Sequence, residues 1–337
     1  MKKILITGGA GYIGSHTAVE LWNAGLEPII LDDFSNSQEE VLNRLEEITG
    51  KRFACYRGDC NQRFVLDQIA KDHQLEGVIH FAAFKAVGES TQQPLAYYKN
   101  NLGSLLVLLE FMGANKITNL VFSSSCTVYG QPDVLPVTEA TPRKDAESPY
   151  GNTKKIGEDI LLDYVKSKPG IRVVALRYFN PVGAHPSAKI GELPMGTPQN
   201  LVPFITQTAA GIRQKLTVFG NDYDTPDGSC VRDYIHVVDL ADAHVKALRF
   251  LFEKPLDFYE VFNVGTGTGN TVLEVIHVFE QVNGLKLAYE IGPRRAGDVV
   301  KTWADTQKIN AVLGWYPKYS LEDCMRDSWR WQQTLPN

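Results

Sequence analysis

The sequence is poor in cysteine and has no long apolar run. Its 337 residues include five cysteines, an odd number, and no two of them form a C-x-x-C pair. This usage argues against a disulfide framework or a structural zinc site, so we expect a cytoplasmic protein without a metal. The most apolar stretch, Leu105 to Met112, contains Glu110 and is far shorter than the roughly 18 residues of a membrane span.

A surplus of positive charge is also absent. The chain has 34 Lys and Arg against 39 Asp and Glu, a net charge of -5 and a pI near 5.8. We therefore expect neither a nucleic acid nor a membrane surface as partner, although a local arginine site for a small anion is compatible with this balance. The motifs G-x-x-x-x-G-K-[ST], G-x-S-x-G and H-E-x-x-H are missing, so P-loop, serine-hydrolase and zinc-hydrolase chemistry are not supported.

The first 180 residues alternate short apolar runs with longer helical patterns. This alternation predicts an α/β fold with a parallel sheet covered on both faces. The predicted strands are Ile4–Thr7, Pro28–Leu31, Phe53–Tyr56, Gly77–Phe81, Leu120–Ser123 and Arg172–Leu176. The predicted helices between them cover 12–24, 38–49, 62–73, 94–114 and 150–166.

Several prolines and glycines after Asn180 break this rhythm, and the helices expected there are shorter, at 200–212, 240–252, 271–283 and 321–333. The length favours two domains. We expect an approximate boundary near residue 180, with domains at 1–180 and 181–337, and the chain is free to cross between them. The second domain should be the smaller, of mixed α/β type.

A glycine-rich turn follows the first predicted strand and opens a helix. Gly8, Gly11 and Gly14 fit the spacing G-x-x-G-x-x-G, and Gly9, Gly11 and Gly14 fit the spacing G-x-G-x-x-G. Both let the backbone approach a pyrophosphate at a helix N-terminus, as in the doubly wound Rossmann fold. Asp32, about 18 residues further on, is suited to adenosine ribose hydroxyls and would repel a 2′-phosphate, which favours NAD over NADP.

A second glycine-rich run, Gly265 to Gly269, also lies between a strand-like and a helix-like segment. It has no acidic residue at the matching distance, so a plain turn is favoured over a second nucleotide site. His236 and His244 lack a third metal ligand at a fitting spacing and are interpreted as polar support or core residues.

Tyr150 and Lys154 stand four residues apart on a predicted helix, which puts both side chains on one face. An ammonium near a phenol lowers the pKa of the phenol, and this predicts Tyr150 as a general base. Ser123, Ser124 and Ser125 follow a parallel strand at the end where such sheets bind ligands.

These elements, in this order, resemble the extended short-chain dehydrogenase/reductase family, and within it the enzymes that epimerise UDP-hexoses at C4. The matching stretches run through nearly the whole chain: Gly8–His16, His80–Ser90, Ser123–Gly130, Tyr150–Lys154, Arg177–Pro186, Phe219–Tyr223 and Val231–His236. The resemblance implies a Rossmann domain for NAD, a second domain for the UDP-hexose, a transient 4-keto sugar and a role in galactose metabolism.

The resemblance also implies site residues. A catalytic triad is implied at Tyr150, Lys154 and Ser125. The positions implied for NAD are Gly8, Gly11, Tyr12, Ile13, Gly14, Asp32, Asn36, Asp59, Cys60, Phe81, Ala82, Lys85, Asn100, Ser123, Tyr150, Lys154 and Phe179. Those implied for the substrate are Ser125, Thr127, Tyr150, Asn180, Asn200, Leu201, Thr217, Phe219, Arg232, Arg295, Asp298 and Thr302.

Two positions refine the expected activity. Related 4,6-dehydratases carry an Asp-Glu pair where this chain has Cys126-Thr127, which favours epimerisation over dehydration. Thr302 stands where a large tyrosine would crowd the sugar 2-substituent, so we hypothesise that UDP-GlcNAc and UDP-GalNAc are also accepted, unless another wall closes the pocket.

The resemblance further implies a homodimer through the helices near 94–114 and 150–166. The alternatives are an epimerase of another nucleotide sugar and a non-catalytic NAD-binding regulator; the presence of Tyr150 and Lys154 argues against the regulator.

Overall fold

The computed structural model describes residues 1–295 and 298–336, which form two compact units. The first unit consists of 1–130, 143–178 and 241–262. The second consists of 131–142, 179–240 and the described residues from 263 onward. The chain changes unit between Tyr178 and Phe179, close to the predicted boundary, and it also crosses before and after 131–142 and 241–262.

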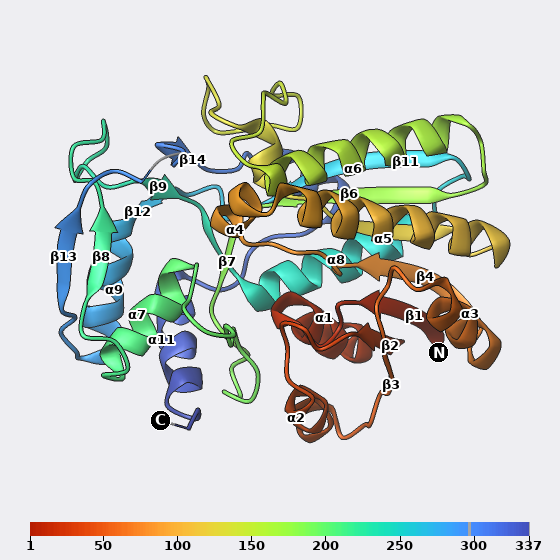
Figure 1. The fold of residues 1–337 in the computed structure, drawn as a ribbon, viewed down its shortest axis with the longest axis horizontal. Helices are drawn as coiled ribbons and strands as arrows, with labels where there is room; N and C mark the ends of the chain where they lie inside the picture. The colour runs from red at the N-terminus through yellow and green to blue at the C-terminus, as the bar shows by residue number, and fades with distance from the viewer. Residues whose placement is uncertain (296–297, 337) are drawn as a thin grey trace. The chain divides into compact units, whose positions relative to one another are not determined.

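A seven-stranded sheet forms the centre of the first unit (Figure 1). Its strand order is β11-β6-β5-β4-β1-β2-β3, and each neighbouring pair from β6 to β3 is parallel. The strands are β1 (Lys2–Thr7), β2 (Leu26–Asp32), β3 (Ala54–Arg57), β4 (Leu75–His80), β5 (Asn119–Ser123), β6 (Arg172–Tyr178) and β11 (Phe258–Val264), of which the last two residues belong to the second unit. The predicted doubly wound α/β fold is confirmed.

The order of the strands creates a point where the chain connections diverge, between β1 and β4. Ligands of open α/β sheets bind beside the carboxyl ends of strands at such a point. The loops after β1 and β4 meet there, because Phe81 and Ala82 both donate backbone hydrogen bonds to the Thr7 carbonyl, at 3.0 and 3.1 Å.

Helices cover both faces of this sheet. They are α1 (Tyr12–Asn23), α2 (Glu40–Thr49), α3 (Arg63–Asp72), α4 (Val87–Gln92), α5 (Pro94–Ala114), α6 (Pro149–Lys166) and α8 (Val237–Phe252). The first residues of α8, up to Leu240, belong to the second unit. A short 3₁₀ helix, η1, spans Cys126–Tyr129. Helices α5 and α6 lie side by side (Figure 1).

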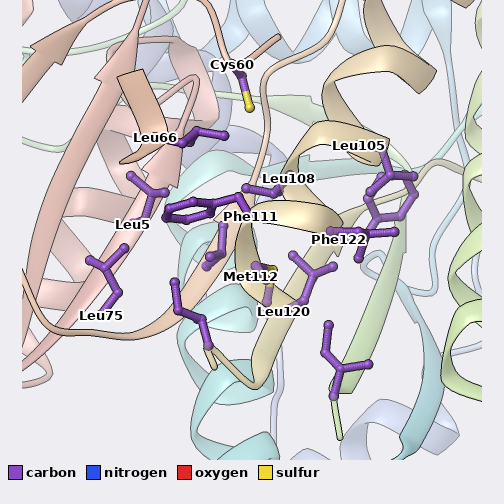
Figure 2. Close-up of a cluster of buried hydrophobic side chains, with 14 of the residues drawn as sticks. Leu5, Cys60, Leu66, Leu75, Leu105, Leu108, Phe111, Met112, Leu120 and Phe122 are labelled. Carbon is purple, nitrogen blue, oxygen red and sulfur yellow. The ribbon is translucent and has the colours of Figure 1, made fainter. Parts of the chain in front are cut away.

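The apolar core on one face of the sheet explains why α5 is so uniformly hydrophobic. Figure 2 shows Leu105, Leu108, Phe111 and Met112 of α5 together with Leu66 of α3 and with strand side chains. Alternate residues of β1 divide between the faces, so that Leu5 enters this core while its buried neighbours point the other way. A strand covered on both faces reads as a continuous apolar run, as the sequence pattern predicted.

The second unit contains small sheets and shorter helices. Its strands are β7 (Asn180–Val182), β8 (Leu216–Phe219), β9 (Val231–Arg232), β10 (Tyr234–His236), β12 (Asn270–Thr271), β13 (Tyr289–Gly292) and β14 (Lys301–Thr302). Its helices are α7 (Leu201–Ala209), α9 (Val272–Asn283), α10 (Gln307–Leu313) and α11 (Leu321–Gln332). Apolar residues of α7, α9 and α11 pack with β8 and form its core.

None of the helices within 1–295 and 298–336 combines the length and the apolar character that crossing a membrane requires.

Candidate active site

In the glycine-rich loop between β1 and α1, each glycine is required for a different steric reason. Gly8 has a φ of +71°, which favours glycine, and a Cβ on Gly14 would lie 2.2 Å from the Gly8 carbonyl oxygen. A Cβ on Gly9 would press on the Ile6 and Ile30 side chains. A Cβ on Gly11 would lie 3.2 Å from the Gly8 carbonyl oxygen, and apart from its chain neighbours no other described atom would lie within 4 Å of it. Gly8, Gly9 and Gly14 thus shape the turn, whereas a Cβ on Gly11 would meet the Gly8 oxygen alone, which leaves its other sides open to a ligand.

Asp32 ends β2 and ties this loop to the next one. One carboxylate oxygen accepts the backbone N–H of Ala10 at 2.9 Å, and the other accepts the N–H of Phe34 and the hydroxyl of Ser37, each at 2.9 Å. Burial raises the pKa of Asp32, and these hydrogen bonds act in the opposite direction. The carboxylate that the sequence predicted for the ribose therefore also holds the glycine loop in place.

Other residues predicted for the cofactor lie at the same carboxyl edge of the sheet. Asp59 follows β3 and accepts two hydrogen bonds from Asn61, which in turn donates to Asn100 of α5 at 3.2 Å. Cys60 is buried, and burial raises the pKa of its thiol to about 12, so it is poorly suited to act as a nucleophile.

The remaining cofactor positions differ in exposure. Tyr12 and Ile13 form the first turn of α1, whose N-cap, Gly11, has no side chain to bind the first amides. Asn36 and Lys85 lie exposed on loops after β2 and β4. Phe179 is buried but belongs to the second unit.

The predicted catalytic residues meet at the end of β5. Lys154 is 4 % exposed; its Nζ donates to the Ser123 carbonyl at 2.7 Å and lies 5.9 Å from the ring centre of Tyr150. Ser125 hydrogen-bonds to Tyr150 and its Oγ also accepts the backbone N–H of Thr127 at 3.2 Å. The helix that carries Tyr150, α6, is capped at its N-terminus by Ser148, whose hydroxyl accepts the Gly151 N–H.

Burial changes the acid–base properties of this group in a way that the sequence did not predict. The expectation was a lowered pKa for Tyr150. In the chain by itself, burial and the nearby Tyr178 raise the pKa of Tyr150, while the hydrogen bond from Ser125 lowers it. Burial also lowers the pKa of Lys154 to about 8. The polypeptide alone therefore favours a neutral phenol, and a positively charged ligand is needed to favour the phenolate.

Thr127 has a buried Oγ1 with no hydrogen-bond partner among the described residues. A buried unpartnered hydroxyl is costly unless something else binds it, which fits its predicted place on the substrate. Nearby, the hydroxyl of Tyr178 forms a short hydrogen bond with the Ser123 hydroxyl, and burial raises the pKa of Tyr178 to about 12.

Two arginines predicted for the substrate converge within the second unit. Asp298 lies between them, 3.7 Å from an Arg232 guanidinium nitrogen and 2.5 Å from one of Arg295. The Arg295 guanidinium also lies over the ring of Phe219, 5.7 Å from its centre, and that ring is 43 % exposed. Planar cations held beside an open aromatic face suit a diphosphate attached to a flat base.

The other residues predicted for the substrate flank this arrangement. Thr302 of β14 pairs with Arg232 of β9 in the strand register and is buried. The backbone N–H of Asn180 donates to the Asp233 carbonyl at 2.9 Å. Asn200 directly precedes α7, which starts at Leu201, and Thr217 lies on β8 two residues before Phe219.

The second glycine-rich run binds an anion that belongs to the chain itself. The buried Asp233 carboxylate accepts the backbone N–H groups of Thr266, Gly267 and Ala304 at 2.8, 3.1 and 3.1 Å, and the Thr266 hydroxyl at 2.7 Å. These donors are already used, which supports the plain turn over a second nucleotide site. No group of three or more His, Cys, Asp or Glu within 1–295 and 298–336 is arranged to hold a metal ion.

Comparison with known proteins places this geometry in a family. The family model for GDP-mannose 4,6 dehydratase matches residues 5–328. A UDP-glucose 4-epimerase of Bacillus subtilis is 51 % identical over 336 residues, 99 % of this chain and 98 % of that protein. This chain belongs to the UDP-glucose 4-epimerase family.

Solved structures agree with that assignment. UDP-glucose 4-epimerase from Stenotrophomonas maltophila, with bound NAD and formylated UDP-arabinopyranose, has a TM-score of 0.96 at 44 % identity, covering 99 % of this chain and 98 % of its own. The Bifidobacterium longum enzyme, in complex with NAD⁺ and UDP, has a TM-score of 0.95 at 44 % identity and covers 98 % of each chain.

Sequence reasoning missed residues that support this UDP-glucose 4-epimerase-type site. Asn101 bonds to both backbone groups of Phe84 and to Thr153, so it joins the loop after β4 to α6. Asp233 fixes the strand end next to Arg232. Neither has a distinctive signal in the sequence, because Asn101 follows another asparagine and Asp233 follows an arginine. Only the fold shows which partners they meet.

Proposed function

We propose that this chain catalyses NAD-dependent epimerisation at C4 of UDP-hexoses, interconverting UDP-glucose and UDP-galactose through a transient 4-keto sugar. The observation that carries the proposal is the arrangement of Tyr150, Ser125 and Lys154 at the end of β5. A phenol hydrogen-bonded to a serine, with a buried ammonium beside it, can remove and return a hydroxyl proton.

NAD fits the residues of the first unit. Gly11 opens where a pyrophosphate would approach the start of α1, and the Asp32 carboxylate is compatible with ribose hydroxyls but not with a 2′-phosphate. When bound, NAD supplies a reversible two-electron oxidant for the sugar C4 carbon and adds a positive charge. Residues of this unit proposed to line it are Tyr12, Ile13, Asn36, Asp59, Cys60, Phe81, Ala82, Lys85 and Asn100.

The protein's own part in the chemistry is proton transfer. Tyr150 in its phenolate form takes the proton of the sugar 4-hydroxyl, and Ser125 hydrogen-bonds the same oxygen. Because burial raises the pKa of Tyr150 in the polypeptide alone, the base becomes competent when positive charge is bound nearby. This couples the presence of the cofactor to the reactivity of the base.

Substrate binding is proposed to rest on the UDP group. Arg232 and Arg295 neutralise the diphosphate, Phe219 stacks on the base, and Asp298 orients both guanidiniums. Asn180, Asn200, Leu201 and Thr217 complete this set, with Thr127 on the sugar. Inversion at C4 requires the sugar to present its other face, so a firm grip on UDP with few sugar contacts suits the reaction.

The direct test is incubation of the purified protein with UDP-galactose and no added NAD, followed by measurement of UDP-glucose and NADH. We expect UDP-glucose without net NADH, because the reaction is redox-neutral and NAD remains bound. NADH that accumulates in step with product would instead identify a dehydrogenase. A 4-keto-6-deoxy product would identify a dehydratase, which the Cys126-Thr127 pair disfavours.

Acceptance of N-acetylated sugars is a second candidate activity. The small, buried Thr302 lies opposite Arg232 in the strand register and leaves room for a larger 2-substituent than a tyrosine would. Turnover of UDP-GlcNAc by the purified protein tests this directly, and its complete absence would show that another wall closes the pocket.

A homodimer through α5 and α6 is also proposed. Leu95 and Leu106 of α5 are 82 % and 48 % exposed, which leaves apolar surface for a partner helix pair. Sedimentation of the wild type and of Leu106→Glu tests it: a dimer that becomes a monomer supports the proposal, and a monomeric wild type contradicts it. A cytoplasmic location stays a prediction from the cysteine usage.

A further inference from the structure

Three consecutive serines at the end of β5 each make a different contact. The carbonyl of Ser123 accepts Lys154 Nζ, and Ser125 bonds to Tyr150, as described above. Ser124, between them, is fully buried, and its hydroxyl donates to a carboxylate oxygen of Glu158 at 2.5 Å. Neither Ser124 nor Glu158 has a role in the proposed reaction so far.

The partners of these serines form one stripe on α6. Tyr150, Lys154 and Glu158 follow one another at four-residue spacing, so they share a helix face. Each of them bonds to one of the three serines. The stripe therefore docks on the strand end at three points, of which the proposed chemistry uses two.

Glu158 is held firmly enough to serve as a fixed point. Its side chain is 1 % exposed, and its carboxylate is bound by the Arg177 guanidinium at 2.8 and 2.6 Å. Arg143 donates to the same carboxylate at 3.3 Å, and Arg177 also donates to the Tyr129 hydroxyl at 2.9 Å. A carboxylate with charged donors on both oxygens has little freedom to move.

The Ser124 hydroxyl joins this fixed point to the place where β5 ends. The ladder of β5 stops at Ser123, and Ser125 is already the N-cap of η1. Between them, the Ser124 backbone N–H is shared by the carbonyls of Phe122 and Leu176, each at 3.0 Å, so its hydroxyl supplies a further link of this segment to α6.

We propose that Glu158 is a positioning residue for the reaction, which acts through the Ser124 hydroxyl to set the distance between Ser125 and Tyr150. This inference rests on the proposed epimerase function. Small displacements of reacting groups lower the rate of the chemical step without weakening substrate binding. The role is therefore visible in kcat and not in KM.

The test compares Ser124→Ala with Ser104→Ala, which removes an equally buried hydroxyl whose hydrogen bond, to the Asn101 carbonyl, stays within α5. Ser124→Ala leaves the ion pair of Glu158 and Arg177 intact and should fold. We expect about a tenfold fall in kcat with UDP-galactose, a KM within about twofold of wild type, and unchanged bound NAD. The loss of one buried hydrogen bond should lower the melting temperature by no more than in the Ser104→Ala control. Ser104→Ala should leave kcat unchanged.

A pH profile adds a readout that loss of packing would not move. Burial raises the pKa of Tyr150, as do Tyr178, Cys126 and Tyr97, while the Ser125 hydrogen bond lowers it. If that bond loosens, the pKa of the base rises, so the acid limb of kcat in Ser124→Ala should shift to higher pH.

The double variant tests whether Glu158 acts through Ser124. Because both changes remove the same interaction, Ser124→Ala combined with Glu158→Gln should lower kcat no further than Glu158→Gln alone. The proposal is overturned if Ser124→Ala keeps the kcat of the Ser104→Ala control or if the two changes add. It is also overturned if the loss of kcat follows a loss of bound NAD, or a fall in melting temperature larger than that of the Ser104→Ala control. A wild-type protein that does not convert UDP-galactose would refute the proposed function, and this proposal with it.

Discussion

Replacement of Lys154 by methionine should stabilise the cofactor-free protein while abolishing turnover. Burial lowers the pKa of Lys154 from 10.5 to about 8. At about 1.4 kcal/mol for each tenfold change in proton affinity, the fold opposes the ammonium by about 3 kcal/mol near neutral pH. Methionine removes this penalty but leaves the Ser123 carbonyl without its donor, at a cost of about 1 kcal/mol.

The sign of the difference should reverse with pH. Below about pH 8 the lysine is protonated in the folded and unfolded states, so the whole penalty applies and Lys154→Met is more stable by about 2 kcal/mol. Wild-type stability then rises between about pH 8 and pH 10.5, as the folded state loses its proton first. Above that range only the lost hydrogen bond remains, and the variant is the less stable by about 1 kcal/mol.

Calorimetry of cofactor-free protein at both ends of this range measures the effect. A gain of about 2 kcal/mol corresponds to about 4 °C or more in melting temperature for a unit of this size. Lys166→Met, on the exposed side of the same helix, controls for the loss of a lysine charge. A variant that is less stable than wild type near pH 7 would refute the reasoning, because the ammonium would then carry no burial penalty.

Three further predictions concern the proposed activity. Tyr150→Phe should keep bound NAD but lose turnover by about 10²-fold or more, and near-normal kcat in a UDP-galactose assay would remove Tyr150 as the base. Gly14→Ala should destabilise the fold by about 2 kcal/mol or more, because its Cβ would lie 2.2 Å from the Gly8 carbonyl oxygen. Gly11→Ala, whose Cβ would lie 3.2 Å from the same oxygen, should lower the melting temperature of cofactor-free protein much less and should weaken NAD retention. Equal effects of the two in thermal melts and NAD titrations would contradict the separate roles. Thr302→Tyr should lower the turnover of UDP-GlcNAc by at least about tenfold and leave the turnover of UDP-glucose unchanged. An unchanged ratio of the two rates in paired kinetics would show that Thr302 does not set the selectivity.

Much of the first unit was predictable because its signals are local. Apolar runs of β1, β2 and β5 and the periodicity of α1, α3, α5 and α6 reproduce the observed elements to within a few residues. A strand covered on both faces and a helix with an apolar face each leave a pattern in consecutive residues. The short elements were missed: α4, α10 and η1 are held by their surroundings and have too few residues to show a period.

The candidate site was predictable as a set of residues but not as an environment. The spacing of Tyr150 and Lys154 predicts a shared helix face, yet the direction of the pKa change at Tyr150 depends on burial, which no spacing reveals. Likewise, the glycines of Gly265 to Gly269 match an anion-binding loop, and the carboxylate that they bind comes from Asp233, about 30 residues earlier in the chain.

The several hydrogen bonds of Asp32 limit how the cofactor preference of this chain could be re-engineered. Exchanging Asp32 for a small neutral residue would remove the repulsion of a 2′-phosphate, but it would also release the Ala10 amide and the segment from Phe34 to Ser37. A single substitution toward NADP would therefore loosen the loop that receives the pyrophosphate of either dinucleotide. A redesign has to supply a new acceptor for Ala10 together with the cation for the extra phosphate.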